Sequence, residues 1–384
     1  MAERRRQQLV AELRELGCIR TQNVADAFAS VERERFVPPT TPLDRVYDTD
    51  EAIPTRLDNA GVSISSSSAP RIMAVMLEML GPELGQRVLE IGAGTGYNAA
   101  LLSRVVGPKG SVISIDIDPE VVVEAVEHLE DADITGVTVI GGDGWLGHRG
   151  QTFDGIIVTA ECWDISPEWV EQLAQGGTLV LPLWLRPGLT LALAFEKTHD
   201  LLTSRSAAYC GFMPLRGPHA SPPLRALVPS VPWDDRPEAA EQRWLAYFDD
   251  ATEDRTTAVF DLLKEPVPVR LPSSPFAGWN VRLALQESGP ICFTRMHPPF
   301  GFALGLFDPD LPSLAVLYGD SVYSYGQPDC GDRLVAFLST PEPLDIADLT
   351  MVVTPHGTVR TQTDSVCISR PSFDLWISQN STSQ

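Results

Sequence analysis

Residues 87–100, RVLEIGAGTGYNAA, contain the pattern that decides the fold. Arg87–Ile91 predict a short buried strand, the glycine-rich segment Gly92–Gly96 predicts a tight turn, and Asn98–Val106 predict a helix. Because glycine has no Cβ, glycines at alternate positions allow a backbone turn to approach a ligand closely. The spacing Gly-x-Gly-x-Gly, preceded by the acidic Glu90, lacks the fourth-position pattern of the dinucleotide fingerprint Gly-x-Gly-x-x-Gly. The stretch therefore predicts a ligand site at a strand end and favours a ligand other than a dinucleotide.

Strands and helices alternate along the rest of the first half of the chain. Further short apolar runs predict strands at 111–115, 137–140, 153–158 and 178–181, and amphipathic runs predict helices at 120–131 and 168–174. The segments that connect them are short. This alternation predicts an α/β fold in which a Rossmann-like, open parallel sheet carries helices on both faces.

Polar residues follow the carboxyl ends of three successive predicted strands. Asp116 ends the second strand, 20 residues after Gly96, and Asp143 follows the third strand between Gly142 and Gly144. Ligands of open α/β sheets bind outside these strand ends, where a carboxylate can accept both ribose hydroxyls. The set suits S-adenosylmethionine, with the glycines near its methionine part, Asp116 at the ribose and Asp143 at the adenine. The alternative is that both aspartates only cap helices.

The predicted cofactor-binding residues are thus spread over three strand ends. They are Glu90, Gly92, Gly94, Gly96, Tyr97, Asp116, Ile117, Gly142, Asp143 and Gly144. Tyr97 and Trp145 could instead pack in the core. The six cysteines and six histidines are scattered along the chain, which predicts that there is no metal site.

The composition is that of an acidic globular protein. The 384 residues include 51 acidic and 29 basic side chains, for a formal net charge of −22, and 43% of the residues are hydrophobic. Because a negative surface repels phosphate backbones, nucleic acid is a poor candidate partner. No run approaches the roughly 20 apolar residues that cross a bilayer, and the polar N-terminal segment has no signal-peptide core. We therefore expect a cytoplasmic protein with no membrane partner.

The length of the chain predicts more than one domain. We expect an N-terminal helical cap and substrate loop over 1–80, a Rossmann-like core over 81–216, a proline-rich linker over 217–238 and a smaller C-terminal domain over 239–384. In this last domain, helices are predicted at 239–248 and 256–263, followed by short runs bounded by Gly, Pro and Asp. These runs are typical of strands, so the C-terminal domain is expected to be β-rich α+β.

Several motifs resemble those of the protein-L-isoaspartate O-methyltransferases. The similarity extends from about Leu9 to Leu215 and includes, besides the glycine-rich turn, Arg35-Phe36-Val37-Pro38-Pro39, Gly176-Gly177-Thr178-Leu179-Val180-Leu181-Pro182 and Phe212-Met213-Pro214-Leu215. The first and last of these motifs are not general features of methyltransferases. The resemblance implies an S-adenosylmethionine-dependent carboxyl O-methyltransferase whose substrate is a peptide or protein with an aspartyl or isoaspartyl carboxylate.

The same family carries a Thr-Ile-Ser-x-Pro segment whose serine lies beside the transferred methyl group and the substrate carboxylate. The corresponding segment here is Ser65-Ser66-Ser67-Ser68-Ala69-Pro70. Counting back from Pro70 assigns that serine to Ser68, with Ser67 beside it, whereas counting from Ser63-Ile64-Ser65 assigns it to Ser65. The resemblance thus implies a catalytic serine among Ser68, Ser67 and Ser65, with Ser68 preferred. Four consecutive serines are also typical of a flexible linker.

Two features depart from the family's usual pattern. The loop Pro54–Ser68 is several residues longer, and the residues after 216 have no counterpart in ordinary members. Extended relatives methylate an aspartate of ribosomally made, modified peptides such as lanthipeptides, lasso peptides and graspetides, which installs aspartimide or isoaspartate. We expect this chain to resemble that branch, with the extra domain serving substrate recognition or self-association as a homodimer. The alternatives are general repair of isoaspartyl proteins, another methyl acceptor, and a non-catalytic module that binds S-adenosylmethionine.

Overall fold

The computed structural model describes most of the chain as two compact units. The described residues are 1–57, 63–222, 224–228, 231, 233, 244–249, 252–271, 274–295, 301–358 and 365–380. Unit 1 comprises Met1–Leu183, Leu191–Ala220 and Thr350–Ile377, and unit 2 comprises Trp184–Thr190, Ser221–Leu349 and Ser378–Gln384. These units differ from the contiguous domains expected from the sequence, because Thr350–Ile377 belong with the first half of the chain.

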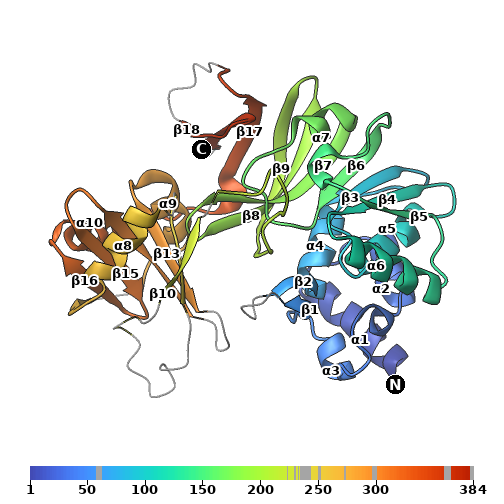
Figure 1. Ribbon diagram of the computed structural model, residues 1–384, viewed down its shortest axis with the longest axis horizontal. Helices are drawn as coiled ribbons and strands as arrows, with labels where there is room; N and C mark the ends of the chain where they lie inside the picture. Colours follow the sequence, from blue (N-terminus) through green and yellow to red (C-terminus); the bar gives the residue numbers. More distant parts are fainter. Residues whose placement is uncertain are drawn as a thin grey trace. The chain divides into compact units, whose positions relative to one another are not determined.

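The parallel strands of unit 1 form the predicted Rossmann-like sheet (Figure 1). Its strands are β3 (Arg87–Ile91), β4 (Ser111–Asp116), β5 (Val137–Gly141), β6 (Phe153–Val158) and β7 (Leu173–Arg186), alternating with α5 (Tyr97–Val106), α6 (Pro119–Asp131) and α7 (Pro167–Gln172). The spatial order β7-β6-β3-β4-β5 means that β4 and β6 pair with opposite edges of β3. The order of strands therefore reverses at β3, and such a switch point opens a ligand crevice at the carboxyl ends of the strands.

Antiparallel strands extend this sheet beyond β7. β8 (Leu189–Thr198) and β9 (Leu201–Tyr209) come next, and β17 (Leu349–Pro355), β19 (Phe373–Gln379) and β18 (Ser365–Ser369) follow in that order. β17 pairs with β9 through Val352–Thr203 and Val353–Leu202. The C-terminal segment thus completes the edge of the Rossmann-like sheet, which local sequence patterns do not reveal because the pairing is long-range.

The N-terminal part of unit 1 is a helical cap followed by a hairpin. Its elements are α1 (Ala2–Glu15), α2 (Gln22–Ser30), η1 (Arg33–Phe36), α3 (Leu43–Val46), β1 (Ile53–Leu57), β2 (Ser63–Ser67) and α4 (Pro70–Leu80). Leu9, Leu13 and Phe28 lie in its core with at most 1% of their surface exposed. Ser65, Ser66 and Ser67 of the serine run fall in β2, which pairs with β1, so residues 63–67 form a strand and not a flexible linker; Ser68 directly follows this strand.

Unit 2 contains a seven-stranded sheet whose order is β10-β11-β13-β14-β15-β16-β12. Its elements are β10 (Arg225–Val228), β11 (Trp244–Tyr247), α8 (Glu253–Leu262), β12 (Val267–Arg270), α9 (Trp279–Gln286), β13 (Pro290–Arg295), β14 (Phe302–Asp308), β15 (Ser313–Tyr318), β16 (Ser321–Gly326), α10 (Asp329–Ser339) and η4 (Ile346–Asp348). The β-rich α+β character expected for this half is confirmed.

Two local predictions for the second half differ from the structure. The helix predicted at 239–248 is wrong where the chain is described, because Trp244–Tyr247 form β11, with Trp244 and Ala246 buried on one face. The predicted linker over 217–238 contains β10, which pairs with β11, while residues 223, 229–230, 232 and 234–238 lie outside the described part. Alternation of buried residues with period two decides for strand over helix in β11.

Two further sequence features can be followed in the structure. All six cysteines are free thiols, and within the described ranges no three His, Cys, Asp or Glu side chains gather as metal ligands would. Every helix in the described part is too short or too polar to cross a lipid bilayer.

Candidate active site

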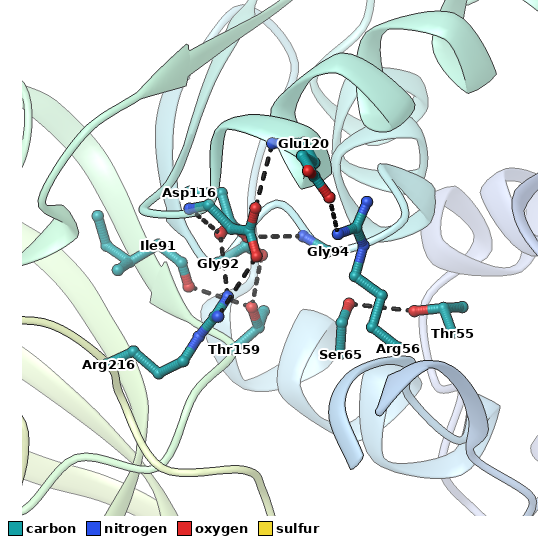
Figure 2. Close-up of polar contacts among 11 residues, drawn as sticks. Thr55, Arg56, Ser65, Ile91, Gly92, Gly94, Asp116, Glu120, Thr159 and Arg216 are labelled. Carbon is teal, nitrogen blue, oxygen red and sulfur yellow. Dashed lines mark hydrogen bonds and ion pairs between the residues drawn. The ribbon is translucent and has the colours of Figure 1, made fainter. Parts of the chain in front are cut away.

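The glycine-rich turn after β3 lies at the switch point of the sheet. Gly92, Gly94 and Gly96 have positive φ angles of 99°, 51° and 84°, which L side chains rarely adopt. A methyl group on Gly92 would come within 2.5 Å of Thr159 Oγ1. The Thr159 hydroxyl donates a hydrogen bond of 2.7 Å to the Gly92 carbonyl, so the turn is fastened to the end of β6 (Figure 2).

Asp116, at the end of β4, faces this turn. Its carboxylate is 9% exposed; Oδ2 accepts a hydrogen bond of 3.1 Å from the Gly94 N–H and Oδ1 accepts one of 3.1 Å from the Asp118 N–H. Asp118 caps α6 by accepting from the Glu120 N–H, so Asp116 is not the capping residue there. The structure therefore holds an oriented carboxylate beside the glycine turn, as Figure 2 shows.

The end of β5 lies beside Asp116. The Gly142 N–H donates to the Asp116 carbonyl at 2.9 Å, and, apart from Gly142 and its two chain neighbours, no atom of the described chain lies within 4 Å of the place where a Gly142 Cβ would be. Asp143 is half-buried and accepts a hydrogen bond of 3.0 Å from the Trp145 N–H. Asp143 therefore caps the short helix η2 (Gly144–Leu146), as the capping alternative predicts, with open space at Gly142 next to it.

Glu90 lies beneath the turn and not on its surface. The side chain is 0% exposed, and its two oxygens accept hydrogen bonds from Asn98 Nδ2 at 2.7 Å and from Ser114 Oγ. Burial, together with the nearby charge of Asp116, raises the pKa of Glu90 to about 7, against the lowering effect of these two hydrogen bonds. Glu90 thus joins β3, β4 and α5 under the site, and a direct contact with the cofactor stays a prediction.

Other predicted residues are also buried by protein. A Cβ on Gly96 would come within 3.2 Å of the Ala125 carbonyl, and one on Gly144 would come within 2.5 Å of Ile91 Cγ2. Tyr97 is 1% exposed in the core, as the packing alternative predicts. The small size of Gly96 and Gly144 is therefore needed for packing inside the protein.

The serine segment reaches the glycine turn from the opposite side. The Ser66 carbonyl lies 3.6 Å from where a Gly94 Cβ would be, so β2 lies against the turn. Ser65 Oγ accepts a hydrogen bond of 3.1 Å from Thr55 Oγ1 of the paired strand. Ser67 Oγ is buried and has no hydrogen-bond partner among the described residues, and Ser68 is half-buried. The structure thus brings the three candidate serines and Gly94 into one region.

Arg33 fixes the end of the serine segment. Its fully buried guanidinium donates to the Ser68 carbonyl at 2.9 Å and to the Ser67 carbonyl at 3.4 Å. The same group lies over the Tyr97 ring, 5.2 Å from its centroid, and Tyr97 directly follows the glycine turn. Arg33 therefore links the serine segment to the start of α5.

The polar groups of the crevice fit S-adenosylmethionine. Asp116 offers carboxylate oxygens for ribose hydroxyls, and it is preoriented by two backbone N–H groups. The Gly92–Gly96 turn gives close backbone approach, and the position beside Gly142 is open. Carboxylate, glycine turn and open strand end together match the needs of a nucleoside joined to an amino acid.

Two residues that touch this set are not predicted from the sequence. Thr159 directly follows β6, so its position at a strand end was the available signal. Arg216 places its guanidinium nitrogens 3.8 Å from Asp116 Oδ1 and 3.4 Å from Asp118 Oδ2. No local pattern marks Arg216, because it approaches β4 from a segment that follows the last matched motif.

A family model and individual relatives both relate this chain to the same protein family. A family model described as "Protein-L-isoaspartate(D-aspartate) O-methyltransferase (PCMT)" matches residues 4–220. A protein-L-isoaspartate O-methyltransferase of Methanopyrus kandleri is 39% identical over 217 residues, covering 56% of this chain and 92% of the relative. A protein of the same name from Pyrobaculum neutrophilum is 37% identical over 210 residues, covering 54% of this chain and 97% of the relative.

A solved structure extends the similarity beyond the matched half. It is named as a protein-L-isoaspartate O-methyltransferase, with a TM-score of 0.52 and 25% sequence identity. The alignment covers 90% of this chain and 96% of the other. Because only a tenth of this chain is left unaligned, most of the residues after 216 have structural counterparts in a protein of that name.

The buried Glu90 carboxyl predicts a pH-dependent stability. Because its folded pKa of about 7 exceeds the ordinary value of 4.5 for a glutamate, the folded chain binds more protons than the unfolded chain between these pH values. The free energy of unfolding should therefore fall as the pH rises through this window, by about 3 kcal/mol at most. Glu90→Gln removes the titrating group and, with its amide nitrogen turned toward Ser114 Oγ, can keep both hydrogen bonds.

We expect Glu90→Gln to gain stability relative to wild type from pH 5 to pH 7.5 in urea unfolding experiments. Glu171→Gln, which changes an exposed carboxyl group, is the matched control and should follow the wild-type curve. Parallel curves for wild type and Glu90→Gln would show that Glu90 is not held in a protonated, buried state.

Proposed function

Because the chain belongs to the protein-L-isoaspartate O-methyltransferase family, we propose that it methylates the free carboxylate of isoaspartyl residues in peptides and proteins. The family resemblance predicted from the sequence is confirmed, and with it an S-adenosylmethionine-dependent carboxyl O-methyltransferase. The roles given below to individual residues are part of the proposal.

The contact between the serine segment and the glycine turn carries the proposal. Ser66 packs against Gly94, while Arg33 holds the backbone of Ser67 and Ser68. A hydroxyl in this segment can donate to an acceptor carboxylate without adding charge. We assign this role to Ser68, with Ser65 and Ser67 as the neighbouring candidates.

The reaction demands positioning more than acid–base chemistry. When bound, S-adenosylmethionine supplies an electrophilic methyl group on its sulfonium sulfur. Carboxylates are ionised at neutral pH, so the acceptor needs no strong general base. The residues proposed to hold the cofactor at the crevice surface are Gly92, Gly94, Asp116, Ile117, Gly142 and Asp143, with Glu90, Gly96, Tyr97 and Gly144 supporting them. The chain contributes orientation of the acceptor and exclusion of water.

Two forms of this function differ in the range of peptides and proteins that would accept the methyl group. General repair is favoured because the isoaspartate methyltransferase name is borne both by a relative that matches about half of this chain and by a structure that aligns with most of it. Methylation of an aspartate in one ribosomally made, modified peptide is the second candidate. The long Pro54–Ser68 segment supports it, although residues 58–62 lie outside the described part. The homodimer and the cytoplasmic location stay predictions.

A peptide assay tests the proposed activity. We expect a short isoaspartyl peptide to gain one methyl group with S-adenosylmethionine, while the same peptide with ordinary aspartate does not. Methoxide leaves more readily than oxide, so the ester should then lose methanol as the next backbone amide closes a succinimide. Mass spectrometry follows both steps. If isoaspartyl peptides stay unmodified while one modified precursor peptide is methylated, the specialised candidate replaces general repair; no methylation of any peptide would reject both.

Ser68→Ala tests the proposed catalytic serine. The loss of one hydrogen bond to a charged acceptor should slow methyl transfer about 10- to 100-fold. The dissociation constant of S-adenosylhomocysteine should remain close to that of wild type, because Ser68 is assigned to the acceptor side. Ser63→Ala, at the start of the preceding strand β2, is the control. Slowing by Ser65→Ala but not by Ser68→Ala would transfer the role to Ser65, and lost cofactor binding in Ser68→Ala would contradict the assignment.

A further inference from the structure

The segment Met213–His219, which we call the strap, crosses the carboxyl ends of the central strands. It is fastened beside the end of β6, where the Glu161 N–H donates to the Met213 carbonyl and the Leu215 N–H donates to the Glu161 carbonyl, both at 2.8 Å. From there it continues toward the ends of β4 and β5. The strap therefore runs over the crevice in which ligands of such sheets bind.

Arg216 brings a positive charge to the proposed ribose-binding carboxylate. Its guanidinium lies 3.8 Å from Asp116 Oδ1 and 3.4 Å from Asp118 Oδ2. Figure 2 shows the side chain of Arg216 pointing toward Asp116. The side chain is 39% exposed, so the ion pairs lie at the edge of the site and are open to water and salt. Arg216 thus places its positive charge beside an oxygen of Asp116 that ribose hydroxyls would use.

The next residues of the strap cover the neighbouring strand ends. Gly217 has φ +108°, and a Cβ there would lie 2.6 Å from Ile117 Cδ1 and 3.9 Å from Asp143 Oδ1. The His219 ring stacks on Trp145, with centroids 4.7 Å apart and planes 9° from parallel. One short segment therefore contacts Asp116, Ile117 and Trp145 together.

We propose that Arg216 and His219 set the affinity of the cofactor site by competing with the adenosine group for these surfaces. The proposal rests on the assignment of the S-adenosylmethionine site made above. In the closed strap, Arg216 neutralises Asp116 and His219 covers the aromatic face of Trp145. A purine nucleoside bound at Asp116 and Ile117 displaces both side chains, so the strap opens when the cofactor binds.

The size of the effect follows from the strength of the strap contacts. Only molecules whose strap is open can bind the cofactor, so the apparent affinity is the intrinsic affinity multiplied by the open fraction. Weakening the closed strap raises this fraction and therefore tightens binding. Exposed ion pairs contribute about 0.2–1 kcal/mol, which limits the gain to about fivefold. Because salt screens exposed charges, binding to wild type should also tighten as ionic strength rises.

Calorimetric titration with S-adenosylhomocysteine measures this competition without requiring catalysis. We expect Arg216→Gln to bind about two- to fivefold more tightly than wild type and to lose the salt dependence, whereas Arg216→Lys, which keeps the charge, should stay near wild type. Arg205→Gln is the matched control, because Arg205 is an exposed arginine paired with Glu196 at 3.5 Å. His219→Ala removes the ring that stacks on Trp145, so it tests the proposal independently of the ion pairs. It should also tighten binding.

Two results would overturn the proposal in distinguishable ways. Unchanged or weaker binding by both Arg216→Gln and His219→Ala, with Arg205→Gln like wild type, would make the strap a neutral or favourable part of the site and reject competition. Absence of binding by folded wild type and all variants would instead reject the cofactor site itself, and the proposed function together with it.

Discussion

The hydrogen bond from the Gly94 N–H to the Asp116 carboxylate is the contact on which the site depends. It joins the turn after β3 to the end of β4 at the place where the order of strands reverses. Gly94 has a positive φ in this contact, and the acceptor is the acidic residue at the last position of β4. Glu90 and Thr159 hold the same turn from below and from β6. The crevice is therefore a consequence of sheet topology made rigid by a few polar contacts.

The rest of unit 1 surrounds this crevice. The serine segment covers one side through Ser66, and the strap covers the other through Arg216. The C-terminal segment contacts the protein further from the glycine turn. The Ser372 N–H donates to Asp164 Oδ2 at 3.0 Å, and the Arg370 guanidinium lies 4.7 Å from the Trp163 ring centroid. Trp163 and Asp164 belong to the loop that follows Thr159. The segment Thr350–Ile377 thus supports the loop beside the glycine turn.

The sequence predicts the parallel core well because its signals are local. Short apolar strands, helical periodicity and the residues at strand ends all lie within a few positions of Gly92, Asp116 and Asp143. Pairing of β17 with β9 joins residues far apart in the chain, and no local period records it. The strand at Trp244–Tyr247 is specified by burial in its sheet, which overrides a helix-like composition. Arg216 lies near the site only because of the path that the chain takes in the fold, so no local sequence pattern predicts its position.

The central claim is that Asp116 and the glycine turn bind the nucleoside part of S-adenosylmethionine. The most direct measurement is calorimetric titration of wild type and Asp116→Ala with S-adenosylhomocysteine, after circular dichroism has shown that both are folded. We expect saturable binding by wild type and a loss of about tenfold or more in Asp116→Ala, since a charged hydrogen-bond acceptor is removed. Equal affinities of the two proteins, or no binding by wild type, would contradict the central claim.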